Sequence, residues 1–201
     1  MDNKGYSAMN TPNLVPPDSG LAHTTPPNEE MKPSEALTLK TAFEKIVTKD
    51  PRCTGLARYI ANIRIFWSHS IPTACAGHGF IFFNPKFYDS IPEQTRITVM
   101  VHEVWHLILK HLERGKNCDP YIHNKAADHV INNALEDDGF TFDGTDPCKD
   151  PVHKGKSTEQ VYNEIYETEK QKKPDLEAMA GVVSAEQIED LVEQIAEAEG
   201  S

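Results

Sequence analysis

The chain has 201 residues, of which 38% are hydrophobic, and a formal net charge of −11. A chain of this size can bury one sizeable core, and two full domains are not expected. The acidic balance argues against nucleic acid as a main partner, and no apolar run approaches the about 18 residues that a membrane span needs.

The N-terminal segment, residues 1–33, is predicted to be a disordered arm. It is rich in proline, asparagine, serine and threonine and has no periodic hydrophobic pattern. A helical pattern begins at Ser34 and ends before Asp50-Pro51, and a second short helix is expected over about 54–61.

Two strands are predicted next, at 63–67 and 80–83, because both runs are β-branched and aromatic. A loop over 68–79 joins them, and Asn84-Pro85 closes the second strand. We expect them to form a small sheet.

The following helix is predicted over about 91–114. Ser90-Ile91-Pro92-Glu93 has the pattern of a capping box with a proline in the first turn, and Gly115 is a typical stop signal. Its middle is apolar almost all round, which is typical of a helix buried in the core of a protein.

This helix contains His102-Glu103-Val104-Trp105-His106, which matches the H-E-x-x-H motif of zinc hydrolases. Positions four apart lie about 40° apart around a helix, so both imidazoles can bind one ion. Glu103 then stands beside the ion, where a general base is needed. The alternative is a pair of ordinary core histidines, but their burial beside a carboxylate would require several hydrogen-bonding partners at once.

A catalytic zinc ion needs a third protein ligand. The next predicted helix runs from Asp119-Pro120 to Gly139, and its periodicity places Asp128 on the inward face and His129 on the solvated face. A carboxylate directed at the core is unfavourable unless it is paired or metal-bound. We therefore favour Asp128 over His129, with a structural salt bridge as the alternative role of Asp128.

Other polar residues are weaker candidates. His111 follows His106 by five positions, about 140° around the helix, so we expect it to point away as a surface or second-shell residue. Asn124 and Asn132, one turn either side of Asp128, either orient its carboxylate or face water. Four loop residues are candidates for stabilising an oxyanion: His69, His78, Tyr121 and His123.

The C-terminal part begins with a second capping box, Ser157-Thr158-Glu159-Gln160, which predicts a helix through about Tyr166. An acidic tail, 171–201, follows. Ser184 opens one amphipathic helix in it, with Ile188, Leu191, Val192 and Ile195 on one face. This face should dock on the domain, on a second copy or on a protein partner.

Several blocks between about Leu37 and Tyr166 carry a family resemblance: Pro72-Thr73-Ala74, Ile81 to Pro85, His102 to Arg114, Ala126 to Asn132, and Ser157 to Tyr162. In this order they resemble a metallopeptidase domain of bacteria and phages that is often fused ahead of a von Willebrand factor A-like domain. Too little chain follows Tyr166 for that second domain.

The resemblance implies a zincin-like fold, with a small sheet beside the active-site helix and Asp128 as the further zinc ligand. By analogy with zincins, an edge strand such as 80–83 would pair with an extended peptide substrate.

We therefore expect an α+β, zincin-like domain over 34–170, mostly helical, with a small sheet or hairpin beside the active-site helix. It would be a zinc-dependent metallopeptidase in which His102, His106 and Asp128 hold Zn²⁺. Glu103 would act as general base toward the zinc-activated water. The substrate would be a peptide or protein.

Two further hypotheses differ in class. The first is a catalytically inactive zinc-binding interaction module that uses the arm and the acidic C-terminal helix to bind a protein partner. The second, a zinc hydrolase acting on nucleic acid, is disfavoured by the acidic balance.

The four cysteines have no C-x-x-C spacing and the N-terminus has no secretion signal, which together favour free thiols and a cytoplasmic location.

Overall fold

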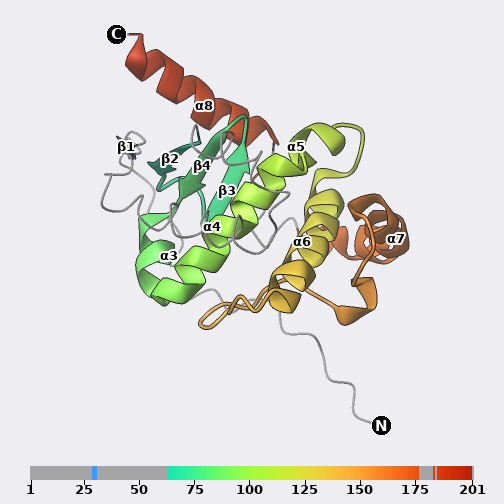
Figure 1. The fold of residues 1–201 in the computed structure, drawn as a ribbon. Helices are drawn as coiled ribbons and strands as arrows, with labels where there is room; N and C mark the ends of the chain where they lie inside the picture. The colour runs from blue at the N-terminus through green and yellow to red at the C-terminus, as the bar shows by residue number, and fades with distance from the viewer. Residues whose placement is uncertain (1–28, 31–62, 177–182, 184, 201) are drawn as a thin grey trace.

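The computed structural model describes residues 29–30, 63–176, 183 and 185–200 (Figure 1). In these ranges the chain is mostly helical with one small sheet, which agrees with the predicted α+β class. The helices predicted between 34 and 61, most of the N-terminal arm and the cap at Ser184 lie outside the described residues. None of the helices in the described ranges is long and apolar enough to cross a membrane.

The sheet has four strands in the order β1-β2-β4-β3, namely β1 (Glu29–Glu30), β2 (Arg64–Trp67), β3 (Ala74–Gly77) and β4 (Phe80–Phe83). The central strand β4 pairs in parallel with β2 and antiparallel with β3. The short strand β1 pairs with β2, so two residues of the arm that we expected to be disordered are ordered.

Strand β3 was not predicted, and its presence changes which strand lies at the edge. Its sequence, Ala-Cys-Ala-Gly, has little of the β-branched and aromatic content that marks a strand. The two-residue turn His78-Gly79 reverses the chain with φ values of 53° and 85°, as in a type I′ hairpin. The expectation that 80–83 is an edge strand is therefore wrong, because β4 is paired on both sides, and among the described strands β1 and β3 lie at the two edges.

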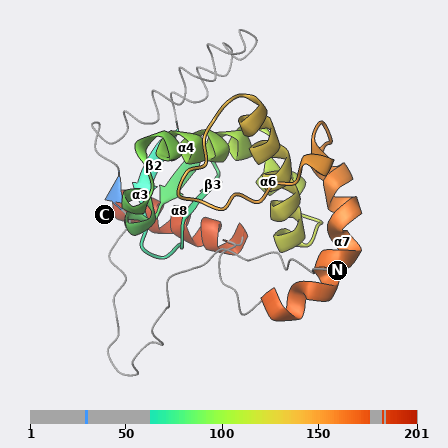
Figure 2. The ribbon, with the colours of Figure 1, turned by 90° about the horizontal axis from the view of Figure 1, so that it is seen from below.

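The two faces of the sheet are covered by different helices, as Figure 2 shows. Ile65, Ile81 and Phe83 belong to the core shared with helix α4 (Glu93–Ile108), whereas Phe66 and Phe82 pack in a second core with helix α8 (Ala185–Glu199). Alternation along each strand sends successive side chains to opposite faces. The sheet is thus the middle layer between α4 and α8.

Helix α8 is the amphipathic helix of the acidic tail, and it docks on the sheet of its own chain. Ile188, Leu191 and Ile195 are buried there, as the periodicity predicted. The approach is close at Gly77, where an added Cβ would lie 2.6 Å from Ile188 Cγ2. A glycine at this position of β3 therefore permits the helix to lie flat against the strand.

The two helices that follow strand β4 begin differently from the prediction. Helix α3 (Pro85–Ser90) was not expected, and Asn84 caps it by accepting hydrogen bonds from two backbone N–H groups of its first turn. The predicted capping box at Ser90 does not form, because its hydroxyl donates to the carbonyl of Phe87. Helix α4 starts after Pro92 without a side-chain cap.

The single helix predicted over 91–114 is interrupted. Helix α4 ends at Ile108, and a short helix α5 (His111–Arg114) follows. Between them Lys110 adopts the left-handed conformation, with φ 54° and ψ 44°. The break turns the chain, so the angle around a continuous helix no longer says where His111 points. The predicted continuity is wrong, because no glycine or proline marks the break and the first such signal in the sequence is Gly115.

Replacing Lys110 with glycine is expected to leave the protein as stable or stabilise it by up to about 1 kcal/mol. The left-handed conformation costs an L-residue about 1–2 kcal/mol, while glycine adds about 0.5–1 kcal/mol of backbone entropy to the unfolded chain. Chemical denaturation measures the difference. Lys116→Gly is the matched control, since Lys116 has a negative φ and glycine there should only destabilise. A clear loss of stability in Lys110→Gly would contradict this account.

Helices α6 (Pro120–Asp137) and α7 (Thr158–Leu176) pack along each other on the far side of α4 from α3, with the 3-10 turn η2 (Pro151–His153) in the connection. Asp119 caps α6 as predicted. The second predicted capping box is confirmed, since Ser157 and Gln160 exchange hydrogen bonds at the start of α7. Helix α7 runs ten residues beyond Tyr166, past the boundary expected at residue 170.

Candidate metal centre

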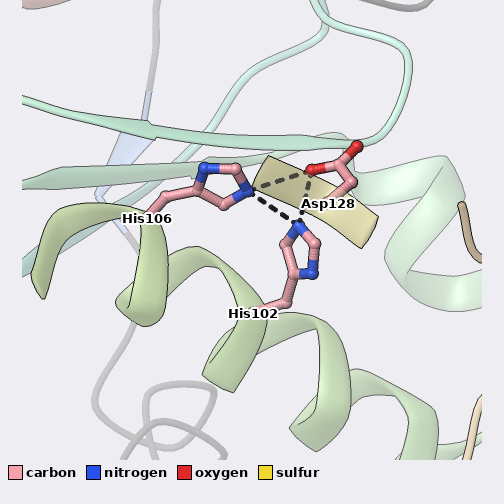
Figure 3. A group of neighbouring side chains, drawn as sticks. All are labelled: His102, His106 and Asp128. Atoms are coloured by element: carbon pink, nitrogen blue, oxygen red, sulfur yellow. Dashed lines mark hydrogen bonds and ion pairs between the residues drawn. The ribbon is translucent and has the colours of Figure 1, made fainter. Parts of the chain in front are cut away.

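Three side chains from two helices converge at the junction of α4 and α6. His102 and His106 project from the same face of α4, and Asp128 reaches them from α6 (Figure 3). The Nε2 atoms of the two histidines are 2.9 Å apart. Asp128 Oδ1 lies 3.1 Å from His106 Nε2 and 3.3 Å from His102 Nε2. The structure therefore brings together the three residues that were predicted as metal ligands.

The spacing of these atoms suits a small cation. Neighbouring ligand atoms in a tetrahedral zinc site are about 3.3–3.5 Å apart, given bonds of about 2.0–2.2 Å. The three observed separations, 2.9, 3.1 and 3.3 Å, are at or slightly below that range. Without a cation, two imidazole nitrogens face each other and share one carboxylate oxygen, which only accepts hydrogen bonds. A cation bound to all three lone pairs removes this conflict.

Two of the three side chains, His102 and Asp128, are also held at their other polar atom by asparagines of α6. Asn132 Oδ1 lies 2.8 Å from His102 Nδ1, and the Asn132 amide group donates to the carbonyl of Cys148. The Asn124 amide donates to Asp128 Oδ2 over 3.3 Å. Metal-binding side chains in proteins are typically oriented by such outer contacts. Asn124 and Asn132 were expected either to orient the Asp128 carboxylate or to face water. Both make an orienting contact, but only Asn124 contacts Asp128, whereas Asn132 contacts His102.

The charges in this cluster are strongly coupled. Burial disfavours the charged form of both groups, but the contacts between His102 and Asp128 outweigh it. They raise the pKa of His102 to about 9 and hold the pKa of Asp128 well below its ordinary value. These contacts favour a protonated His102 beside an ionised Asp128, so a proton competes with a metal ion for this imidazole.

The affinity of this centre for a divalent metal ion, measured with Zn²⁺ as the probe, is accordingly expected to rise with pH. Below about pH 9 the ion competes with the His102 proton. Each decrease of one pH unit should therefore lower the association constant by up to about tenfold for each proton that binding releases. Competition with a chelator of known affinity at about pH 6, 7 and 8 measures this slope. Calorimetry in buffers of different ionisation enthalpy counts the released protons. Binding that is independent of pH over this range would contradict the assignment.

Glu103 lies one position after His102 and is buried, with 7% of its surface exposed. Burial raises the pKa of Glu103 above its ordinary value, and the nearby imidazoles of His102 and His106 oppose this shift. Glu103 is therefore a buried carboxylate in the electrostatic range of both candidate histidine ligands.

The structure corrects two predictions about neighbouring histidines. His111 was expected to point away from His106, at the surface or behind the ligands; it is buried and its Nδ1 lies 3.2 Å from His106 Nδ1, so the orientation was wrong but the position behind a ligand agrees. His129 was placed on the solvated face of α6, but only 8% of it is exposed. Its ring packs against His153 and lies near Cys148, because the segment before and through η2 folds over that face of α6.

The four residues considered for oxyanion stabilisation lie in two different parts of the fold. Tyr121 and His123 lie in the first turns of α6 rather than in a loop, and His123 is buried against His111 and Tyr162. His69 and His78 are exposed on the sheet side, and His78 faces Glu189 of α8. None of the four contacts the Nε2 atoms of the cluster in the described part of the chain.

A pocket of about 240 Å³ adjoins the centre at His106. It lies between the β3–β4 hairpin and the junction of α4 with α5. The lining residues are Ala76, Gly77, His78, Gly79, His106, Leu107, Lys110, Leu112 and Glu113. Small residues of the edge strand thus face a space that reaches a candidate metal ligand.

One comparison with known proteins gives a match. A family model described as "Putative metallopeptidase domain" matches residues 34–199. This range includes the three clustered side chains, Glu103 and the docked helix α8. Neither the curated proteins nor the solved structures contain a match to the chain.

Proposed function

The chain belongs to the family described as a putative metallopeptidase domain, and from this premise we propose that it is a zinc-dependent peptidase with a zincin-like fold. The observation that carries the proposal is the cluster of His102, His106 and Asp128, with their ligand atoms 2.9–3.3 Å apart. Glu103, which follows His102 on the same helix, is the proposed general base.

The donor set favours zinc among the common metal ions. Two imidazole nitrogens and one carboxylate oxygen are typical ligands of catalytic zinc, whereas magnesium and calcium prefer oxygen ligands alone. A bound zinc ion would supply a coordinated water with a pKa near 7 and would polarise a substrate carbonyl. His102, His106 and Asp128 would hold it, and three protein ligands leave a fourth position open.

Glu103 would act as the proton carrier of the reaction. As general base it accepts the proton of the attacking water, and it then delivers that proton to the nitrogen of the leaving amine. Its carboxylate is next in sequence to His102 but is not one of the three clustered groups. It therefore remains available for proton transfer.

The substrate would be an extended peptide lying along β3. An edge strand leaves one row of backbone N–H and C=O groups unpaired, and a peptide can add to it as a further strand. β3 is an edge strand of the described sheet, and Ala76 and Gly77 at its end line the pocket that reaches His106. A peptide paired there would pass the metal centre. This geometry replaces 80–83 with 74–77 as the substrate-binding strand.

Metal removal and replacement test the proposal. The measured reaction is the hydrolysis of a mixture of unstructured peptides, monitored by mass spectrometry. Dialysis against a chelator should abolish this hydrolysis, and about one equivalent of Zn²⁺ should restore it. The thermal unfolding midpoint should fall only modestly, because the cores on both faces of the sheet do not include the metal ligands.

The alternative function, an inactive zinc-binding interaction module, predicts another outcome. A structural ion would hold the fold together, so chelation would unfold the protein, and the zinc-loaded protein would cleave no peptide in the mixture. That pair of results would overturn the peptidase proposal.

A further inference from the structure

On the side of its ring away from the other two ligands, His106 contacts the buried His111, and His111 in turn contacts the buried Thr158. His111 Nδ1 lies 3.2 Å from His106 Nδ1, and His111 Nε2 lies 3.0 Å from Thr158 Oγ1. We propose that His111 and Thr158 are positioning residues that stabilise the tautomer of His106 in which Nε2 presents a lone pair to the metal ion. The proposal rests on the proposed function, because it concerns the same centre.

The directions of these hydrogen bonds follow from the number of N–H protons on each imidazole ring. A neutral imidazole has one N–H group and one nitrogen lone pair. A metal ion at the cluster needs the lone pair of His106 Nε2, which leaves the proton on Nδ1, at the opposite side of the ring (Figure 3). That N–H points to His111 Nδ1, which must accept it.

The direction of the second hydrogen bond follows. If His111 Nδ1 accepts, the proton of that ring is on Nε2, and this N–H donates to the hydroxyl oxygen of Thr158. Thr158 can always accept, whatever the orientation of its own proton. The hydroxyl can also donate to His111 Nε2, so the choice between the two tautomers is made by the metal ion: only the arrangement above leaves His106 Nε2 free, and Thr158 accepts the last N–H of that arrangement.

Burial makes these two partners hard to replace. His111 is 4% exposed and Thr158 is 2% exposed, so water cannot easily replace either partner. A buried N–H without an acceptor is destabilising, so loss of the Thr158 hydroxyl would disfavour the arrangement of protons that metal binding needs. The opposite arrangement has the His111 proton on Nδ1, facing His106. His106 would then carry its own proton on Nε2, the atom needed by the metal ion.

The fold supplies this arrangement through two local features. The left-handed residue Lys110 ends α4 and turns His111 back toward His106, although it follows by five positions. Thr158 comes from the first turn of α7, which the capping box of Ser157 and Gln160 fixes. The contact thus links α7, a helix that supplies none of the clustered ligands, to the metal centre.

The test compares pairs of variants that differ in one hydrogen-bonding group. Thr158→Val removes the hydroxyl but keeps the shape, and Thr158→Ser restores it. His111→Phe removes the acceptor for His106, and His111→Asn keeps an acceptor near the position of Nδ1. Zn²⁺ affinity is measured against a competing chelator, and long-range ¹H–¹⁵N spectra of the zinc-loaded protein report the tautomer of His111.

Thr95→Val is the matched control for a general loss of packing. Thr95 is also fully buried and donates to a backbone carbonyl, that of Asp143, over 2.7 Å, away from the cluster. Its removal should lower stability about as much as Thr158→Val but leave the Zn²⁺ affinity unchanged.

We expect Thr158→Val and His111→Phe to weaken Zn²⁺ binding by about 10–100-fold, with Thr158→Ser and His111→Asn close to the parent protein. The parent spectrum should show the His111 proton on Nε2. Equal affinities across the series, a proton on His111 Nδ1 in the parent, or the same loss of affinity in Thr95→Val would overturn the proposal. Failure of the parent protein itself to bind Zn²⁺ would instead refute the proposed function.

Discussion

Glu103→Gln is expected to lower kcat/KM for peptide hydrolysis by about 10²–10⁴-fold while leaving the zinc content near one equivalent. Glutamine keeps the size and the hydrogen-bonding oxygen of the side chain but cannot accept a proton at neutral pH. Because Glu103 is not one of the three clustered groups, its replacement should not release the ion. Hydrolysis rates and metal content measured on one preparation separate these two effects.

The matched control for this variant is Glu93→Gln, an exposed position in the first turn of the same helix. It should have the activity of the parent protein. The inactive Glu103→Gln protein also shows whether a co-purifying protease contributes to the measured rates. Undiminished hydrolysis by zinc-loaded Glu103→Gln would rule out the proposed role of this residue.

Asp128→Asn is expected to weaken Zn²⁺ binding by more than the about 10–100-fold that follows the loss of an outer contact. The amide keeps the shape of the carboxylate but removes the negative charge that both imidazoles approach at 3.1–3.3 Å. The protein should stay folded, since the amide can still accept a hydrogen bond. Activity should fall in parallel with metal content, and added zinc should recover part of it.

His129→Asn distinguishes the two adjacent residues of α6 that were weighed as the third ligand. His129 contacts Cys148 and His153 rather than the cluster, so this variant should lose some stability but bind Zn²⁺ as the parent does. If His129→Asn lost the metal and Asp128→Asn kept it, the assignment of the third ligand would be reversed.

Several features that depend on neighbouring residues were predictable from the sequence, although the capping box at Ser90 did not form and helix α3 was not expected. The H-E-x-x-H spacing, the cap of α6 at Asp119, the reciprocal capping box at Ser157 and the apolar stripe of α8 each follow from periodicity or from contacts within one turn. The inward face of Asp128 is of this kind as well. Its position along α6 directs it toward the core, and α4 lies there.

Predictions that depend on distant segments failed. β3 has weak strand propensity and exists because β4 pairs with it and α8 packs closely on Gly77. His129 is buried because the loop through Cys148 and η2 covers its side of α6, and helical periodicity contains no information about such a loop. The break at Lys110 likewise has no local signal, since neither glycine nor proline marks it.

The sequence by itself determined the chemistry of this protein: two histidines and a glutamate at helical spacing, with an aspartate on the inward face of the next helix. Only the tertiary structure decided the geometry around them. It placed Asp128 within 3.3 Å of both imidazoles, turned His111 to the back of His106, and made β3 the edge strand beside the pocket. The physical reason is that donor type and periodicity act within a few residues, whereas hydrogen bonds between helices and strand order arise from packing of segments far apart in the chain.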